Sequence, residues 1–313
     1  LWCMSKKLSI VGISNKSIHA ILDENLLYRS LNNIEGLKVE AGIRLEPPSS
    51  HKPDEAQAPG YTAYVARATY PGKIEKLRAE LSLLPLTETA GLDLTAVPEE
   101  LSGPEKKLII MDVDSTLITQ EVIDQLAAQT GQADRVAAIT HAAMRGEIDF
   151  EKSLQERVGV LEGQPETILD EVATDLTFTA GAQELIHVLH EHGHVVAAVS
   201  GGFIEILTPL SEKVNLDYAR ANKLEIHNNF LTGKLTGEII TADKKREALR
   251  EWAEDAGISA EHIIAVGDGA NDELMMNEAA LGIAFNAKPS TREKADAQIN
   301  VERLDAVRHF LGI

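Results

Sequence analysis

Three short apolar runs, each followed directly by polar residues, set the strongest limit on how this chain can fold. They lie at 107–111, 195–199 and 263–266. Short, continuous apolar runs are typical of strands that are buried on both faces of a parallel sheet. In open α/β sheets, ligands bind outside the carboxyl ends of such strands. The pattern therefore predicts a Rossmann-like, doubly wound parallel sheet with a site at the edge where these strands end.

The first run ends in two acids, Asp112 and Asp114, followed by Ser115 and Thr116. Side chains two residues apart on an extended chain point the same way, so both carboxylates are expected to enter one site. Neighbouring carboxylates repel each other, which favours a bound cation or a shared proton. One carboxylate can then attack a phosphorus atom while the other moves protons. An Asp-rich turn after the strand is the structural alternative.

The second and third runs also end in polar, glycine-rich segments. Ser200-Gly201-Gly202 follows the second run, and Gly267-Asp268-Gly269-Ala270-Asn271-Asp272 follows the third. A lysine pair, Lys244 and Lys245, stands just ahead of a segment with helical spacing. A short motif alone is a weak signal, but four in this order rarely arise by chance. We therefore expect one site assembled from all four segments.

The four segments resemble the motifs of the haloacid dehalogenase superfamily, and within it those of the phosphoserine phosphatases. Asp112-Val-Asp114-Ser-Thr116 is similar to the first motif, Ser200-Gly201 to the second, Lys245 to the third and 267–272 to the fourth. The resemblance covers about residues 105 to 300. It implies hydrolysis of O-phospho-L-serine to L-serine and phosphate, the last step of serine biosynthesis, through an aspartyl-phosphate.

The resemblance also implies a role for each acid. Asp112 would be the nucleophile, because an acyl-phosphate splits one hard displacement into two. Asp114 would be the general acid that protonates the departing serine oxygen, and then the base that activates water. Asp268 would hold Mg²⁺ together with Asp112 and the backbone carbonyl of Asp114, since Mg²⁺ prefers hard oxygen ligands. Asp272 is expected to orient Lys245 or a metal-bound water.

The phosphoryl group is expected to meet residues of the second, third and fourth motifs. Ser200 and the N–H of Gly201 would hold a phosphoryl oxygen, because glycine allows close backbone approach. Lys245 would bring a positive charge to the transition-state oxygens. Lys244 is its rival for that role, and a solvated surface pair is the structural alternative. Asn271 is expected to hydrogen-bond the substrate or a metal-bound water.

Two further residues are expected to select the substrate. Arg157 shares one helix face with Leu154 and Phe150, and if that face is buried the arginine needs an anionic partner. A substrate carboxylate matches its bidentate fork, and a salt bridge within the helical region 119–178 is the alternative. Glu121 can pair with a substrate ammonium group, or it is an acid favoured by a helix N-terminus. Together these residues describe a small zwitterionic phosphomonoester, and phosphoserine is one.

Residues 119 to about 178 interrupt the α/β pattern with helical spacing alone. The apolar positions fall in four stretches, around Val122–Leu126, Val136–Ala143, Leu154–Leu161 and Ile168–Val172. This predicts a helical cap, inserted after the first strand, that closes over the site and excludes water. The α/β alternation then resumes, with helices at 182–192, 203–214 and 245–256, a hairpin around Asn228-Asn229, and strands at 280–285 and 297–301.

The pattern of residues 1–98 predicts a separate domain whose strands and helices follow the order β-α-β-β-α-β. Alternating or apolar strand patterns occur at 8–13, 37–45, 61–70 and 92–97, with helical spacing at 18–27 and 74–84. The order matches a ferredoxin-like split unit and resembles the ACT-type regulatory domain. A purely structural or dimerising module is the alternative, since fold alone does not give function. We expect residues 99–313 to form the phosphatase domain, and a homodimer to form through the N-terminal domain.

Charge and composition narrow the classes of partner. The net charge of −19 argues against nucleic acid, whose phosphates need a basic surface. No apolar stretch approaches the length of a membrane span, and the first residues lack the basic start and long apolar run of a signal peptide. A single cysteine, Cys3, cannot form an internal disulfide. These features predict a cytoplasmic protein that binds a small-molecule substrate, with no membrane or nucleic-acid partner.

Two other functions remain open at this level. A related small-molecule phosphatase or a phosphotransferase, for example one that passes phosphate to homoserine, would use the same motifs. A regulatory amino-acid-binding protein with an idle enzyme domain is a rival from a different class. The complete set of acids, serine and lysine argues against the idle domain.

Overall fold

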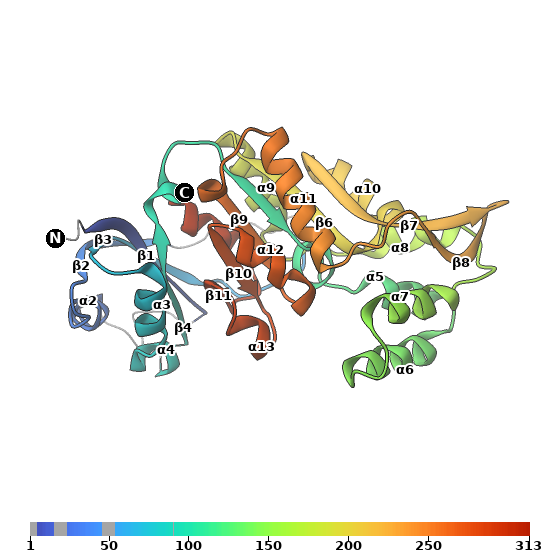
Figure 1. The fold of residues 1–313 in the computed structure, drawn as a ribbon, viewed down its shortest axis with the longest axis horizontal. Coiled ribbons are helices and arrows are strands. Elements are labelled where there is room, and N and C mark those ends of the chain that lie inside the picture. Colours follow the sequence, from blue (N-terminus) through green and yellow to red (C-terminus); the bar gives the residue numbers. More distant parts are fainter. Residues whose placement is uncertain (1–4, 16–23, 46–53, 90) are drawn as a thin grey trace.

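The computed structural model describes residues 5–15, 24–45, 54–89 and 91–313. Within these ranges the chain forms two sheets, one of four strands and one of seven. Figure 1 shows the smaller sheet with its helices at one end of the molecule, the larger sheet in the middle, and a group of helices at the other end. Cys3 and part of the first expected helix, at Ile18, Ile21 and Leu22, lie outside the described residues.

The N-terminal sheet is antiparallel, in the order β2-β3-β1-β4. Its strands are β1 (Lys6–Ser14), β2 (Lys38–Leu45), β3 (Thr62–Tyr70) and β4 (Leu92–Pro98), with helices α2 (Glu24–Asn32), α3 (Ile74–Ser82) and α4 (Pro85–Thr89). All four strands fall where alternating or continuous apolar patterns predicted them. The strand order is that of a split βαββαβ unit.

The two faces of this sheet have different coverings. Leu8 and Ile10 pack in one cluster with Leu27 of α2 and Leu77 of α3. Their neighbours on the opposite face, such as Val11 and Ile13, belong to the core of the large domain instead. The N-terminal sheet is therefore sandwiched between its own helices and the rest of the chain.

The large sheet has the order β11-β10-β9-β5-β6-β7-β8, with β5 in the centre. Its strands are β5 (Leu108–Met111), β6 (Val195–Phe203), β7 (Tyr218–His227), β8 (Phe230–Thr236), β9 (Ile263–Gly267), β10 (Leu281–Phe285) and β11 (Ala297–Ile299). All neighbours pair in parallel except β7 and β8, which form the expected hairpin. The predicted parallel α/β sheet is confirmed.

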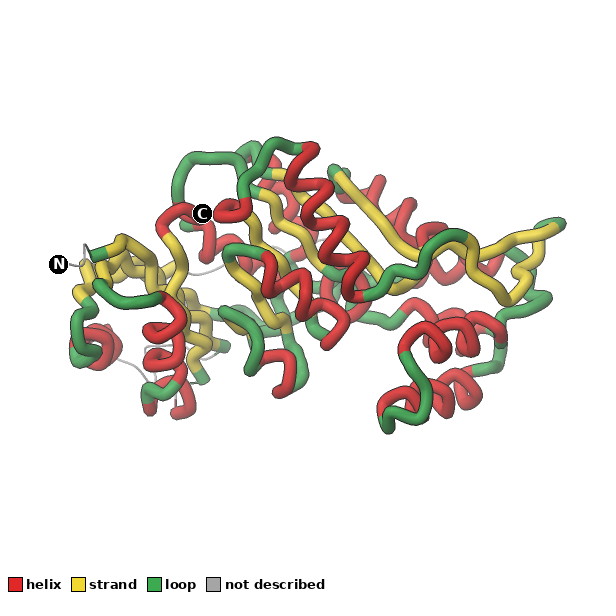
Figure 2. The backbone as a smooth tube through the Cα atoms, viewed as in Figure 1, coloured by secondary structure: helices red, strands yellow, loops and turns green. Residues whose placement is uncertain are grey.

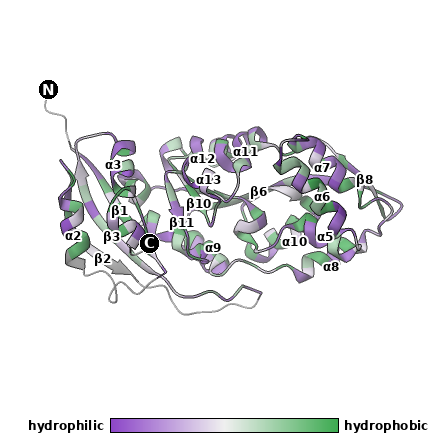
Figure 3. Cartoon of the chain, turned by 90° about the horizontal axis from the view of Figure 1, so that it is seen from below, coloured by the Kyte–Doolittle hydropathy of each residue, from purple (hydrophilic) through white to green (hydrophobic). Residues whose placement is uncertain are grey.

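Helices cover both faces of the large sheet, which explains the continuous apolar runs. Leu108 and Ile110 pack on one side with α11 (Ala242–Asp255) and α12 (Glu273–Glu278). Ile109 and Met111 pack on the other side with α9 (Ala182–Glu191), α10 (Ile204–Val214) and the C-terminal turn η5 (Leu304–Leu311). All four residues of β5 are fully buried. Figure 2 shows these helices flanking the strands, and Figure 3 shows hydrophobic and hydrophilic residues along each helix.

A helical cap is inserted between β5 and α9. It consists of α5 (Val122–Gln129), α6 (Ala133–Met144), α7 (Phe150–Gly159) and α8 (Thr167–Asp175). The chain enters and leaves it along two paired segments, because Thr119 N donates to Thr177 O and Thr179 N donates to Leu117 O, both at 3.0 Å. These segments are the two connections between the cap and the rest of the chain.

The hairpin β7–β8 reaches over the cap (Figure 1). It turns at Asn228 and Asn229, which both have positive φ, as a tight hairpin turn requires. The backbones of the two parts are joined, since Gly163 N donates to Leu231 O and Leu231 N to Gln164 O, each at 2.8 Å. The loop between α7 and α8 is therefore attached to the core at a second place.

The remaining regular elements are short. They are η1 (Glu99–Ser102), η2 (Val113–Leu117), η3 (Ala260–His262), η4 (Ala270–Asp272) and α13 (Pro289–Arg292). Among the described helices, none is long and apolar enough to cross a lipid bilayer.

Candidate active site

Asp112 and Asp114 leave the end of the central strand β5 and line the same cavity. Asp112 N donates to Val266 O of β9 at 2.9 Å, which extends the pairing of β5 with β9 by one residue. The chain then turns tightly through η2, where Ser115 has a φ of 57°. This turn, rather than a continued strand, brings the Asp114 carboxylate back beside Asp112. Val122 N donates to Asp114 Oδ2 at 3.3 Å.

The cavity has a volume of about 470 Å³ and lies between the sheet edge and the cap. Seven of the residues predicted from sequence line it: Asp112, Asp114, Glu121, Arg157, Gly201, Asp268 and Asn271. Ser200 and Lys245, at 2% and 0% exposure, lie buried beside it. The structure thus brings together all nine predicted site residues from five separate segments of the chain.

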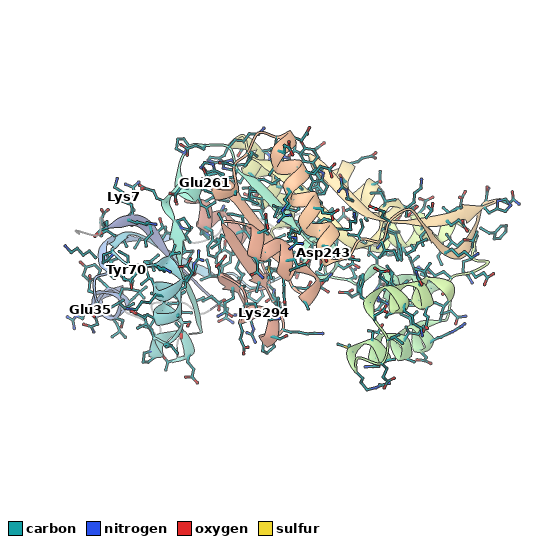
Figure 4. The ribbon with its side chains drawn as sticks, viewed as in Figure 1. Lys7, Glu35, Tyr70, Asp243, Glu261 and Lys294 are labelled. Carbon is teal, nitrogen blue, oxygen red and sulfur yellow. The ribbon has the colours of Figure 1, made fainter. Side chains whose placement is uncertain are left out.

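Lys245 is held between two carboxylates. Its Nζ lies 2.7 Å from Asp112 Oδ1 and 2.7 Å from Asp272 Oδ1. Helix α11 begins at Ala242, three residues before the predicted start, because Thr241 caps it and accepts a hydrogen bond from Lys244 N. The first turn then directs Lys245 inward, whereas Lys244 pairs with Glu238 and Glu247 on the surface. Figure 4 marks Asp243 at this end of α11.

Burial among like charges raises the pKa of three acids in the cavity, Asp112, Asp114 and Asp268. For Asp112, desolvation is the main cause and the charge of Asp272 adds to it. Desolvation, together with Glu121, raises the pKa of Asp114 to about 7. Desolvation, together with Asp272, also raises the pKa of Asp268 to about 7. For Lys245, burial lowers the pKa, but the charges of Asp112 and Asp272 outweigh burial and raise it overall.

The acids form a group that suits a hard divalent cation. Asp112, Asp268 and Asp272 each offer one carboxylate oxygen, and these oxygens lie within 4.8 Å of one another. Mg²⁺ prefers oxygen ligands, and its charge would offset the repulsion that, after desolvation, raises the pKa values of Asp112 and Asp268. Oδ1 of Asp272 accepts a hydrogen bond from Lys245 Nζ, and its Oδ2 accepts one from Gly269 N at 3.1 Å. This arrangement fits its expected role in orienting Lys245.

The Ser200-Gly201-Gly202 loop closes the site from β6. Ser200 Oγ accepts a hydrogen bond from Gly202 N at 2.7 Å. A Cβ atom on Gly202 would lie 2.9 Å from that oxygen and 3.5 Å from the Asp114 carboxylate oxygens. Only glycine fits there without displacing the serine, so the second glycine of this motif keeps Ser200 and Asp114 close.

The cap contributes Glu121 and Arg157. Glu121 Oε1 accepts a hydrogen bond from Ser115 Oγ at 2.6 Å, so the turn of the core and the start of the cap meet at this carboxylate. Arg157 Nε donates to Ser153 O at 3.3 Å, and among the described residues the guanidinium forms no ion pair. Desolvation lowers the pKa of Arg157, and the negative charges of Asp124 and Glu121 offset part of this effect. The guanidinium is thus a half-buried cation at the cavity wall.

Some cavity residues were missed by the sequence analysis. Lys288 stands three residues after the end of β10 and lines the cavity, so the rule that sites lie at the carboxyl ends of parallel strands would have found it. Thr140 and Met144 of α6 also line the cavity, and no spacing signal distinguishes them. Phe150 was named only as marking a helix face and proves to be a lining residue.

This geometry agrees with the comparisons with known proteins. A family model described as haloacid dehalogenase-like hydrolase matches residues 109–277. This chain belongs to the haloacid dehalogenase-like hydrolases.

Individual relatives narrow the resemblance. A phosphoserine phosphatase of Streptomyces coelicolor is 46% identical over 241 residues, which make up 76% of this chain and 58% of the relative. A substrate-bound phosphoserine phosphatase complex superimposes with a TM-score of 0.63 at 42% identity, over 66% of this chain and 99% of the other. The chain thus spans less than two thirds of the Streptomyces relative and corresponds to nearly all of that solved structure.

One similar structure also includes the N-terminal domain. A HAD family hydrolase from Salmonella enterica subsp. enterica serovar Typhi superimposes on this chain with a TM-score of 0.79 at 29% sequence identity. The superposition covers 97% of this chain and 98% of the other. The two structures therefore share the arrangement of a small sheet, a large sheet and a helical cap over the residues that superimpose.

Proposed function

We propose that this protein is a Mg²⁺-dependent phosphatase that hydrolyses O-phospho-L-serine to L-serine and phosphate, the last step of serine biosynthesis. The observation that carries the proposal is the meeting of Asp112, Asp114 and Lys245 in a cavity whose other wall holds Glu121 and Arg157. The phosphoserine phosphatases among its relatives support the choice of substrate.

In the first step Asp112 attacks the phosphorus atom and the serine oxygen departs. Asp112 Oδ1 already accepts from Lys245 Nζ and from Val113 N, which leaves Oδ2 as the attacking oxygen. Because its pKa is about 7, the Asp114 carboxyl group is protonated in a substantial fraction of the molecules at neutral pH, and it gives this proton to the leaving oxygen. The products are serine and a phosphoryl group bonded to Asp112.

In the second step water attacks the phosphorus of the aspartyl-phosphate. Asp114, now ionised, takes the proton from water, and the bond between phosphorus and Asp112 breaks to release phosphate. Lys245, the Ser200 hydroxyl and the N–H of Gly201 stabilise the phosphoryl oxygens. Asp112, Asp268 and the backbone carbonyl of Asp114 would hold Mg²⁺, which when bound neutralises negative charge on the phosphoryl group.

The cap residues account for the preference for an amino-acid phosphate. The Arg157 guanidinium matches a substrate carboxylate, and Glu121 matches the ammonium group. Asn271, at the cavity wall, can donate to the substrate phosphate or to a metal-bound water. Burying the substrate's charges against these partners favours phosphoserine over phosphomonoesters without an α-amino acid.

The test is phosphate release from a panel of phosphomonoesters, measured with Mg²⁺ and with EDTA. We expect strong preference for O-phospho-L-serine over sugar phosphates and over the D-enantiomer, and loss of activity in EDTA. Metal-dependent activity spread over sugar phosphates would retain the catalytic core and refute the assignment of the cap. Phosphate passed to added homoserine would instead identify a phosphotransferase. Phosphate release that Asp112→Asn leaves unchanged would not come from this site, which would support a binding protein with an idle enzyme domain.

We further propose that residues 1–98 are an ACT-like regulatory domain that carries the contacts of a homodimer, and that the protein works in the cytoplasm. The βαββαβ order supports the first point, and a sequence with a single cysteine suits a reducing compartment. Light scattering should give twice the chain mass of 34.0 kDa for the full chain and a monomer for a chain that starts at Glu99. An unchanged oligomeric state in the shorter chain would refute the dimer interface.

A further inference from the structure

The loop that carries Ser200 and Gly201 interrupts the pairing of β6 with β7. Val199 stands opposite Arg220 and Phe203 opposite Asn222, so three residues of β6, 200–202, face only Ala221. Such an expansion removes ladder hydrogen bonds and pushes the strand out of the sheet plane. The backbone groups that the ladder no longer satisfies need other partners if the loop is to keep one conformation.

Asn222 supplies one of those partners from the strand beside the loop. Its Nδ2 donates to Gly201 O at 2.8 Å, and the side chain is 1% exposed. The same amide is engaged at its other end, because Ile240 N donates to Asn222 Oδ1 at 2.8 Å. A carbonyl on one side and an N–H on the other allow only one orientation of the amide. The side chain is therefore a fixed link between two backbone segments.

The second of these segments leads to the catalytic lysine. Ile240 is followed by Thr241, which caps α11, and Lys245 N donates to Thr241 O at 2.9 Å in the first turn of that helix. The Nζ of Lys245 then reaches Asp112. One buried amide thus connects the backbone of the Ser200 loop to the start of the helix that carries Lys245.

We infer that Asn222 is a positioning residue, which sets the distance between the Ser200-Gly201 loop and Lys245 so that both meet the same phosphoryl group. Asn222 is not among the residues that line the cavity, and it acts through the groups it holds. The inference rests on the proposed function, because it assigns a phosphoryl group to the space between the loop and the lysine.

Two substitutions distinguish the two hydrogen bonds of the Asn222 side chain, one to Gly201 O and one from Ile240 N. Asn222→Asp keeps nearly the same shape and the acceptor for Ile240 N, but it places a carboxylate oxygen against Gly201 O. Asn222→Ala removes both contacts. Asn300→Ala is the control, since Asn300 is a partly buried asparagine that, like Asn222, donates from Nδ2, here to Asp93 Oδ1 at 2.7 Å, and it is not among the residues that line the cavity.

Three measurements are made on the full chain in the presence of Mg²⁺: binding of inorganic phosphate by calorimetry, kcat and KM with O-phospho-L-serine, and the melting temperature. We expect Asn222→Asp to weaken phosphate binding about tenfold, the effect of losing one hydrogen bond of about 1.4 kcal/mol. Its kcat should fall at least as much, about 10- to 100-fold, since displaced donors stabilise the transition state poorly. KM should change less than kcat, because Glu121 and Arg157 are untouched.

A purely structural role would give a different result. If Asn300→Ala lowers phosphate affinity as much as Asn222→Asp does at an equal loss of melting temperature, or if Asn222→Asp binds phosphate like the wild type, the inference is wrong. The wild type itself tests the proposed function. A wild type that binds phosphate without turning over phosphomonoesters refutes the phosphatase and still allows the Asn222 comparison, and a wild type that binds no phosphate refutes the inference.

Discussion

Lys245 Nζ lies 2.7 Å from Asp112 Oδ1, and the lysine side chain is fully shielded from solvent. A buried ammonium needs anionic partners, and Asp112 and Asp272 provide them on both sides. The same contact holds one oxygen of the nucleophile in place and lowers the cost of ionising it. Folding energy and catalysis therefore depend on the same pair of residues.

Replacing Lys245 with Met should abolish phosphatase activity and also destabilise the fold. The substitution leaves two buried carboxylates without their cation, and breaking a buried pair in this way costs about 3–5 kcal/mol. Urea unfolding measures the stability change, and phosphate release measures the activity. Lys244→Met is the control, since Lys244 pairs with acids at the surface, where such a pair is worth about 0–1 kcal/mol. Equal effects of the two substitutions would contradict the assignment.

Replacing Asp114 with Asn should affect substrates according to their leaving group. Asparagine cannot donate a proton to the serine oxygen, so turnover of phosphoserine should fall by about 10²- to 10⁴-fold. p-Nitrophenyl phosphate has a leaving group that needs no proton, so its first step should survive and give a burst of nitrophenolate. Asparagine also cannot act as the base that activates water, so water attacks the aspartyl-phosphate slowly in this variant. Acid-quenched samples should therefore contain phosphorylated protein. Equal losses on both substrates and no burst would argue against Asp114 as the general acid.

Removing divalent metal should lower the melting temperature as well as the activity. Desolvation and the negative charge of Asp272 raise the pKa values of Asp112 and Asp268, and a bound cation relieves the repulsion among these acids only in the folded state. Scanning calorimetry with Mg²⁺ and with EDTA should show a higher melting temperature with Mg²⁺. In Asp268→Asn this difference should largely disappear. An identical response of the variant and the wild type would place the metal elsewhere.

The sequence predicts the strand ends well because burial on both faces leaves a continuous apolar run, and β5 shows this with four fully buried residues. It predicts Lys245 only through the resemblance, since the choice over Lys244 depends on where α11 begins, and Thr241 sets that start. Asn222 carries no signal at all. Its role arises from a register shift between β6 and β7, which depends on how two distant segments pair. Local patterns thus find strand ends, and tertiary pairing decides which side chains meet there.

Lowering the pH should weaken the contact between the two domains through His309. The His309 ring lies 3.0 Å from the Oη of Tyr61, the residue just before β3, and burial lowers the pKa of His309 from 6.5 to about 3. A histidine with a depressed pKa in the folded state contributes stability above pH 6.5 and loses it as the pH falls toward 3, by up to about 1.4 kcal/mol per pH unit. Urea unfolding at pH 7 and pH 5 should show a smaller drop for His309→Gln than for the wild type.

The titration of Asp93 changes stability with pH in the direction opposite to that of His309. The comparison with His309→Gln is therefore needed. Desolvation raises the pKa of Asp93 to about 6, so its contribution to stability is present at low pH and is lost as the pH rises through 6. The difference between wild type and His309→Gln removes this background, since both proteins retain Asp93. Equal pH dependence in the two proteins would show that folding does not lower the pKa of His309.

Glu55 should prove to be an anchor of the N-terminal domain on the cap connection. Its two carboxylate oxygens accept from Gly181 N at 3.2 Å and Gln183 N at 2.8 Å, at the start of α9. Beside it, Ala56 N donates to Phe178 O at 2.8 Å, within the segment by which the chain leaves the cap. Glu55→Ala removes both helix-terminal acceptors, so we expect a loss of about 1–2 kcal/mol in the free energy of unfolding.

The second effect of Glu55→Ala should be local. Because residues 54–56 pair with the segment next to the cap, hydrogen exchange should rise at Phe178 and Thr179 more than in the helices of the N-terminal domain. Glu99→Ala is a suitable control, since Glu99 is exposed and its pair with Lys7, at 3.7 Å, lies on the surface. A uniform rise in exchange, or a loss no larger than that of Glu99→Ala, would show that Glu55 does not hold the cap connection.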